Sequence, residues 1–339
     1  MVSQRLWTEG RAIVHPGAVF RTVVLAVVPL VFLAACGADD DDNAAGGGDR
    51  ISIVAAFYPI ATAAEQVGGN LVDVSNLTTA GTEPHDLELN PDQVDELENA
   101  DLVLYLGQGF QPAVAEIAER RDDGAVDLLD TIPLEAGASE ALEAQEASEE
   151  GDGGEAEGEG HEESGLDPHF WLDPQLMADA VDEVEAALSA ASPGDAATFQ
   201  ANAQVYKDQL VDLDDEFATG LGSCERNEIV TSHAAFYYLA QRYGLTQLPI
   251  TGLSPEAEPD AARLADLADQ IEADGITTIF YETLVSPDIA ETLARETGAE
   301  AAVLNPIEGL TQDQLDNGDD YISVMQDNLT ALEQALGCE

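Results

Sequence analysis

Basic side chains are scarce in this sequence of 339 residues. Lysine and arginine together number 11, against 68 aspartates and glutamates, so the formal net charge is −57 at pH 7. The only lysine is Lys207. A surface this acidic repels the phosphate backbones of DNA and RNA, which excludes nucleic acid as a binding partner.

Cysteine and histidine are also few, with three and five residues. The sequence contains no CxxC, HxH or HxxxH pair, and short pairs of this kind mark the usual local zinc sites. Spacing alone is therefore weak evidence for a metal site in this chain.

The apolar run near the N-terminus is too short for a membrane span. It covers residues 23–35, whereas a spanning helix needs about 20 residues. Arginines precede it and Leu33-Ala34-Ala35-Cys36 ends it, so residues 1–35 are predicted to be a signal peptide. Small residues before a cysteine resemble the lipobox of bacterial lipoproteins, which makes Cys36 the expected lipidation site. The alternative is an ordinary signal peptide with an incidental cysteine.

Two segments are too polar to bury a core. Residues 36–50, rich in Asp, Gly and Ala, are predicted to be a flexible acidic tether. Residues 137–165, dominated by Gly, Glu, Asp and Ala with a single His161, are predicted to be a disordered acidic loop. We interpret that loop as a solubilising insertion, with loose gathering of cations as the alternative.

The remaining sequence alternates between strand and helix patterns. Residues 102–106 form a continuous apolar run of the kind that occupies buried parallel strands. Alternation predicts an α/β fold with parallel sheets, in an N-terminal lobe of residues 51–173 and a C-terminal lobe of residues 223–339. Residues 174–222 carry only helical signals and are predicted to link the two lobes.

The two cysteines outside the N-terminal segment are Cys224 and Cys338. Outside the cytoplasm such a pair is usually a disulfide, and this one would close a loop of more than a hundred residues. The alternative is that a thiolate binds metal, although neither cysteine has a CxxC or Cys-His neighbour.

Three of the five histidines fall where ligand sites of open α/β sheets gather. His85, His169 and His233 each lie in a predicted strand-to-helix loop or at a helix start. Three imidazoles and one carboxylate would form a four-coordinate site that suits Zn²⁺. His15 and His161 lie in the leader and the acidic loop.

Five motifs in order give the chain a family resemblance. Residues 81–86 (GTEPHD) resemble the GxEPHxYEP signature of the metal-binding receptors of ABC importers, the cluster A-I group, and residues 167–174 (DPHFWLDP) resemble its DPHxWLDP motif. Three further stretches are similar to that family: TSHAAFYYL at 231–239, LNPIEGL at 304–310 and YISVM at 321–325. One departure is that Leu87 replaces the aromatic residue of the first motif.

The resemblance implies a site and a metal. It assigns metal binding to His85, His169 and His233 and places the metal in the cleft between two lobes joined by a long helix. It implies a fourth carboxylate just before the C-terminal helix, which is Asp319 here, with Asp320, Glu83, Glu282 or water as alternatives. Manganese receptors of this type have a carboxylate at the third position, so His233 favours zinc.

These features predict a zinc-binding receptor rather than an enzyme. We expect a lipid-anchored, extracytoplasmic monomer that delivers Zn²⁺ to an ABC permease. A manganese or iron receptor of the same family is the first alternative. A zinc-dependent hydrolase is the second, although a carboxylate in the fourth position would leave no open site for an activated water.

Overall fold

The computed structural model describes residues 50–134, 166–259 and 261–339. All of them belong to one compact unit that spans residues 48–339. The predicted signal peptide, the tether, the lipidation of Cys36 and the acidic loop lie outside the described residues.

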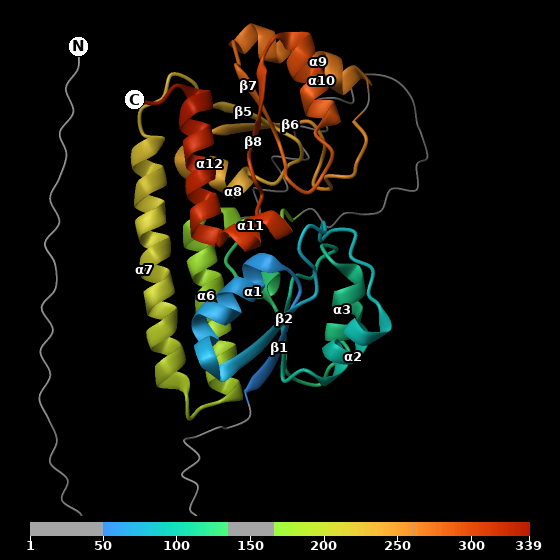
Figure 1. Cartoon of the computed structure of the whole chain (residues 1–339), viewed down its shortest axis with the longest axis vertical. Helices are drawn as coiled ribbons and strands as arrows, with labels where there is room; N and C mark the ends of the chain where they lie inside the picture. The colour runs from blue at the N-terminus through green and yellow to red at the C-terminus, as the bar shows by residue number, and fades with distance from the viewer. Residues whose placement is uncertain (1–49, 135–165, 260) are drawn as a thin grey trace, which may run out of the picture. The chain divides into compact units, whose positions relative to one another are not determined.

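The N-terminal lobe is built around a four-stranded parallel sheet in the order β2-β1-β3-β4. All four residues of β3 are buried, as the apolar run in the sequence predicts. The elements of this lobe, shown from blue to green in Figure 1, are β1 (Ile51–Ala55), α1 (Tyr58–Gly68), η1 (Gly69–Leu71), β2 (Val72–Asn76), α2 (Pro91–Asn99), β3 (Leu102–Tyr105), α3 (Pro112–Ala118), β4 (Ala125–Asp127) and α4 (Leu128–Thr131).

The C-terminal lobe repeats this plan with a second four-stranded parallel sheet, in the order β6-β5-β7-β8. Both sheets place their strands' carboxyl ends at one edge, where ligand sites of open α/β folds form. The elements of this lobe are β5 (Glu228–Thr231), α8 (Tyr237–Tyr243), β6 (Thr246–Pro249), α9 (Ala261–Asp274), β7 (Thr278–Tyr281), α10 (Asp288–Thr297), β8 (Glu300–Val303), α11 (Gln312–Asn317) and α12 (Tyr321–Leu336).

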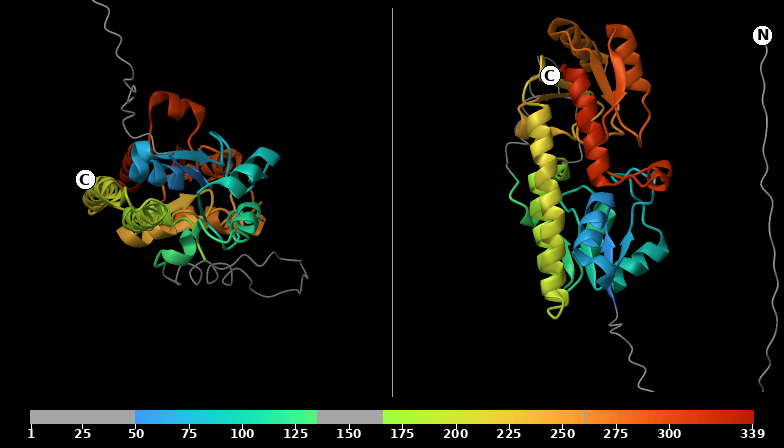
Figure 2. Two further views of the ribbon diagram at one scale, coloured as in Figure 1. Left: turned by 90° about the horizontal axis from the view of Figure 1, so that it is seen from below. Right: turned by 60° about the vertical axis from the view of Figure 1, so that its left-hand side comes forward.

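Two long helices connect the lobes. After the short η2 (Phe170–Leu172), α6 (Pro174–Ala191) begins with an N-cap at Asp173 and a proline at its first position, and α7 (Ala196–Gly220) follows. Helix α7 packs against α6 and α1 and also against α12, so it contacts elements of both lobes. Figures 1 and 2 show α7 alongside α12. The predicted architecture of two parallel-sheet lobes with a long helix between them is confirmed.

A disulfide joins the end of the linking helices to the C-terminus. Cys224 and Cys338 are bonded across a sequence separation of 114 residues. Backbone hydrogen bonds join the same two segments, because the N–H groups of Glu225 and Arg226 both donate to the carbonyl oxygen of Leu336. Within the described residues, no helix is both long and apolar enough to cross a membrane.

The sequence pattern predicts a helix over residues 234–243, whereas helix α8 begins only at Tyr237. The backbone before it is engaged elsewhere. The N–H of Ala234 donates to the carbonyl oxygen of Gly252, and the hydroxyl of Thr231 donates to the carbonyl oxygen of His233. These bonds hold residues 233–236 as a loop rather than as the first turn of the helix.

Candidate metal centre

Four side chains from distant segments converge at the edge where the strands end. His85, His169, His233 and Glu308 each offer one ligand atom, and these atoms lie within 4.8 Å of one another. His85 lies in the loop between β2 and α2, and His169 precedes η2. His233 follows β5, and Glu308 lies between β8 and α11. The group therefore takes two residues from each lobe.

The Glu308 carboxylate lies at the centre of the three imidazoles. Its Oε1 atom is 3.3 Å from Nε2 of His85, 3.2 Å from Nε2 of His169 and 3.2 Å from Nε2 of His233. The side chain of Glu308 is 1% exposed and those of His169 and His233 are fully buried, whereas that of His85 is 13% exposed. His85 is thus the solvent-facing member of the group.

Two of the histidines are oriented by buried carboxylates. Asp167 Oδ1 lies 2.7 Å from Nδ1 of His169, and it also accepts the backbone N–H of His169. Glu282 Oε1 lies 2.6 Å from Nδ1 of His233. A carboxylate against Nδ1 places the ring proton there and leaves the Nε2 lone pair for a metal. The Nε2 atoms of His169 and His233 both face Glu308. The nitrogen that would bind a metal in each ring therefore points to the centre of the cluster.

The charges of the four groups are coupled. Burial would lower the pKa of His233, but the carboxylates of Glu282 and Glu308 hold it well above its usual value. Burial would also lower the pKa of His169, and Asp167 with Glu308 raises it instead. Burial does lower the pKa of His85. Although burial raises the pKa of a carboxyl, His233, His169 and His85 hold the pKa of Glu308 well below its usual value.

The donor set fits a zinc ion. Three imidazole nitrogens and one carboxylate oxygen are a common four-coordinate set for Zn²⁺. Imidazole suits zinc better than it suits manganese or magnesium, which favour oxygen ligands. A cation at this point would replace the contacts between Glu308 and the imidazoles with bonds to all four groups.

The carboxylate that the structure brings to the histidines is Glu308, whereas the family resemblance implied Asp319. Asp319 lies in the turn between α11 and α12, where its N–H donates to the carbonyl oxygen of Gln314, and it is not part of the group. Asp320 is the N-cap of α12. This geometry favours Glu308 over Asp319 as the fourth ligand, because Glu308 belongs to the group and Asp319 lies beyond α11 in the chain.

Glu83 and Glu282, the other carboxylates considered for the fourth ligand, make different contacts. Glu83 accepts hydrogen bonds from the backbone N–H groups of His85 and Asp86, which shape the loop that carries His85. Burial, with the nearby Glu308, raises the pKa of Glu83 to about 8. Glu282 contacts the Nδ1 side of His233 and so orients an imidazole.

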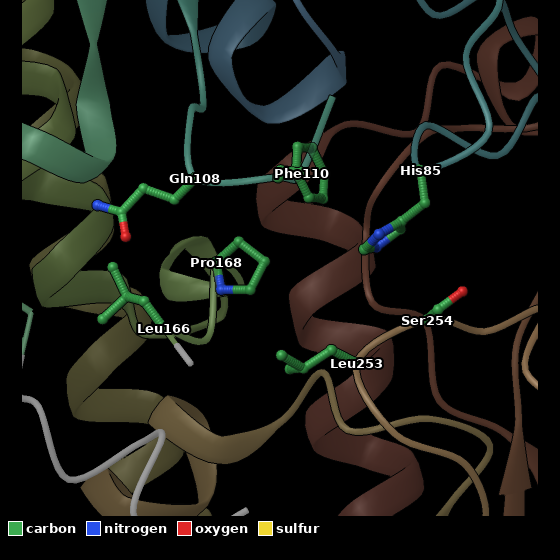
Figure 3. Close-up of a pocket in the computed structure, with 8 residues that line it drawn as sticks. His85, Gln108, Phe110, Leu166, Pro168, Leu253 and Ser254 are labelled. Carbon is green, nitrogen blue, oxygen red and sulfur yellow. The ribbon is translucent and has the colours of Figure 1, made fainter. Parts of the chain in front are cut away.

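An apolar pocket opens beside His85. Its volume is roughly 70 Å³, and its walls include Phe110, Leu166, Pro168 and Leu253. Figure 3 shows the His85 ring and Phe110 on one side of this pocket, with Leu253 and Ser254 opposite. The ring centroids of His85 and Phe110 lie 4.6 Å apart in an edge-to-face arrangement. The exposed edge of the cluster therefore meets solvent through a mostly apolar opening.

Known proteins resemble this chain in sequence and in fold. The family model described as "Zinc-uptake complex component A periplasmic" (ZnuA) matches residues 53–335. The zinc-binding lipoprotein AdcA of Streptococcus pneumoniae (strain ATCC BAA-255 / R6) is 37% identical over 322 residues, which cover 94% of this chain and 61% of the relative. The chain thus spans about three-fifths of the length of that relative.

Two further relatives match over nearly their full length. The high-affinity zinc uptake system protein ZnuA of Bacillus subtilis (strain 168) is 34% identical over 315 residues, covering 92% of this chain and 97% of the relative. The crystal structure of the Zn(II)-bound ZnuA-like domain of Streptococcus pneumoniae AdcA superposes with a TM-score of 0.67 at 36% identity, covering 85% of this chain and 99% of that one. This chain belongs to the ZnuA family of zinc-uptake components.

Proposed function

We propose that this protein is an extracytoplasmic receptor that captures Zn²⁺ at His85, His169, His233 and Glu308. The observation that carries the proposal is the convergence of three Nε2 atoms on one buried carboxylate. The relatives named zinc-binding lipoprotein and zinc uptake protein support zinc as the ion. A nitrogen at the third position, His233, argues against the manganese and iron alternatives.

The captured ion would be delivered to a membrane permease of the ABC type. We infer this partner from the zinc-uptake family and from the layout of the sequence. Residues 1–35 would be removed as a lipoprotein signal peptide, Cys36 would carry the lipid, and residues 36–50 would tether the lobes to the outer face of the membrane. The protein would act as a monomer, since one chain supplies all four ligands.

A receptor fits the cluster better than a hydrolase does. Catalytic zinc sites keep one position open for water, whereas here a protein carboxylate occupies the fourth place. Three further carboxylates near the cluster already have structural partners: Asp167 and Glu282 contact histidines, and Glu83 accepts the backbone N–H groups of His85 and Asp86.

The test is a competition titration on purified protein stripped of metal with a chelator. Zn²⁺ is added with a chromophoric chelator as competitor, and Mn²⁺ is then offered to the zinc-loaded protein. We expect one tight equivalent of Zn²⁺ that excess Mn²⁺ does not displace, and we expect His233→Glu to shift the preference toward Mn²⁺. A wild-type protein that prefers Mn²⁺, or that binds no ion tightly, would refute the proposal.

A further inference from the structure

The backbone next to Glu308 is held in an unfavourable conformation. Ile307 has a φ of 56°, in the left-handed region, and its side chain is fully buried. Of the residues that the structure describes, Gln108 is the only other non-glycine with a positive φ. A β-branched residue in this region is strained, and strain of this kind persists only when the surroundings impose it.

Two buried asparagines impose the turn. Oδ1 of Asn305 accepts the N–H of Ile307 at 2.8 Å. The side chain of Asn328 in α12 makes two hydrogen bonds to the backbone of Asn305. Its Oδ1 accepts the N–H of Asn305 at 2.8 Å, and its Nδ2 donates to the carbonyl oxygen of Asn305 at 2.7 Å. Both asparagines are 3% exposed. Asn328, which lies in α12 and 23 residues beyond Asn305, therefore fixes the segment that carries Glu308.

The turn has a second unfavourable feature. Nδ2 of Asn305 is buried and has no hydrogen-bond partner among the described residues, and an unpaired buried donor destabilises a folded protein. The acceptor oxygen of the same side chain offsets this penalty by holding the N–H of Ile307. A hydrogen bond from another helical segment also holds this turn: Nε1–H of Trp171 donates to the carbonyl oxygen of Pro306 at 2.7 Å.

The position of Glu308 depends on this turn. Its Oε1 atom lies within 3.3 Å of three imidazole nitrogens, and a metal ligand must be placed to within a few tenths of an ångström. If φ at Ile307 relaxed to a negative value, the direction of the next side chain would change and the carboxylate would leave the imidazoles. The strained turn is thus what aims Glu308 at the cluster.

We infer that Asn305 and Asn328 are positioning residues for the carboxylate ligand of zinc. They hold the left-handed turn at Ile307 and act on the ion only through Glu308. The inference rests on the proposed function, because Glu308 binds zinc only if the cluster is the zinc site. The partners of metal ligands typically change metal affinity 10- to 100-fold when they are removed.

A double-mutant cycle tests this inference by zinc competition on Asn328→Ala, Glu308→Ala and the double variant. We expect Asn328→Ala to raise the Kd for Zn²⁺ about tenfold in the wild-type background, and to change it less than about twofold when Glu308 is already absent. Leu332→Ala is the matched control: this side chain is also buried in α12 but lies outside the turn. It should lower the Tm while leaving the Kd unchanged.

A spectroscopic measurement separates placement from general destabilisation. Co²⁺ in a four-coordinate site absorbs visible light much more strongly than Co²⁺ with additional water ligands. We expect Asn328→Ala loaded with Co²⁺ to lose intensity toward the spectrum of Glu308→Ala, while Leu332→Ala keeps the wild-type spectrum.

The possible failures are distinct. A folded Asn328→Ala with wild-type Kd and spectrum, or an equal weakening in both backgrounds, would overturn the positioning role alone. A Glu308→Ala variant with wild-type zinc affinity would instead overturn the ligand set of the proposed function.

Discussion

Nδ1 of His233 lies 2.6 Å from Oε1 of Glu282, and both side chains are buried. The carboxylate comes from the end of β7 and the imidazole from the end of β5, which pair side by side in the C-terminal sheet. The sheet itself therefore sets the direction in which Nε2 of His233 points. A ligand supported in this way is rigid before the metal arrives, which favours tight binding.

This relationship predicts a graded effect of changes at Glu282. Glu282→Gln keeps an oxygen that accepts the Nδ1 proton but removes the charge, so we expect zinc affinity to fall by a few-fold. Glu282→Leu removes the acceptor, and we expect a loss of about 10- to 100-fold. Competition titration measures both, with exposed Glu256→Gln as a control for charge in the same lobe. Equal affinities for the leucine and glutamine variants would argue against orientation by this hydrogen bond.

Removal of the histidines is expected to have unequal effects on stability. His85→Ala and His169→Ala should each abolish tight zinc binding, because each removes a ligand. His169→Ala also leaves the Asp167 carboxylate buried without its imidazole partner, so the metal-free variant should lose about 1–3 kcal/mol more stability than His85→Ala. Urea unfolding of the metal-free proteins measures the difference. If His169→Ala bound zinc as tightly as wild type, the ligand assignment would be wrong.

Zinc binding is expected to release protons and to weaken in acid. The metal requires neutral imidazoles, and the pKa values of His169 and His233 are raised in the metal-free protein. As the pH falls through these raised values, protons occupy the nitrogens that zinc needs, so the apparent Kd should increase already from neutral pH downward. Calorimetry in two buffers with different ionisation enthalpies measures the proton release. A Kd that is constant between pH 8 and pH 6 would contradict this expectation.

An ion pair between the helices predicts a pH dependence of stability. Burial would raise the pKa of Asp214, but hydrogen bonds from Arg242 and Tyr243 lower it. Because the folded pKa lies below the unfolded one, this stabilisation is present above the unfolded pKa and is lost as pH falls through the folded value. Asp214→Asn should therefore cost about 1–2 kcal/mol at pH 7 and progressively less below about pH 4.

Urea unfolding of Asp214→Asn at several pH values checks this prediction. The neighbouring Asp215 is exposed, so Asp215→Asn removes the same charge without the network and should change stability little. A constant difference between Asp214→Asn and wild type from pH 7 to pH 3.5 would show that the charge of Asp214 is not what stabilises the helices.

The disulfide is expected to support the fold without affecting zinc selectivity. It closes a loop of 114 residues, and loops of that length predict a loss of about 2–4 kcal/mol on reduction. Neither Cys224 nor Cys338 belongs to the ligand group. The Cys224→Ser/Cys338→Ser variant should therefore show a lower Tm and an unchanged preference for Zn²⁺ over Mn²⁺. A change of metal preference would indicate that a thiolate takes part in binding.

The sequence predicts the fold well because its signals are local. Apolar runs such as residues 102–106 mark buried parallel strands, and Asp173 followed by Pro174 marks the start of α6. The helix boundaries that differ from the sequence prediction are those fixed by contacts between residues distant in the chain. The start of α8 is one of these, because the N–H of Ala234 bonds to Gly252 rather than to its own helix.

The site was harder to predict for the same reason. The three histidines stand in recognisable motifs, and Glu308 stands in another, LNPIEGL at 304–310, but the resemblance assigned no ligand role to it among the 68 acidic residues. The turn at Ile307 brings it to the cluster. The signal available was the carboxylate between Pro306 and Gly309 inside that motif. Glu282 was one of the alternatives for the fourth ligand. Its Oε1 atom instead contacts Nδ1 of His233, the ring nitrogen that does not face the cluster, and sequence spacing cannot show this.

The proposed ligand set is tested by the coordination of the bound ion, measured by X-ray absorption at the zinc edge on the one-equivalent complex. We expect three imidazole nitrogens and one carboxylate oxygen, all about 2.0–2.2 Å from the zinc, and a loss of the carboxylate oxygen in Glu308→Ala but not in Asp319→Ala. A sulfur ligand, fewer than three imidazoles, or a spectrum changed by Asp319→Ala and not by Glu308→Ala would contradict this ligand set.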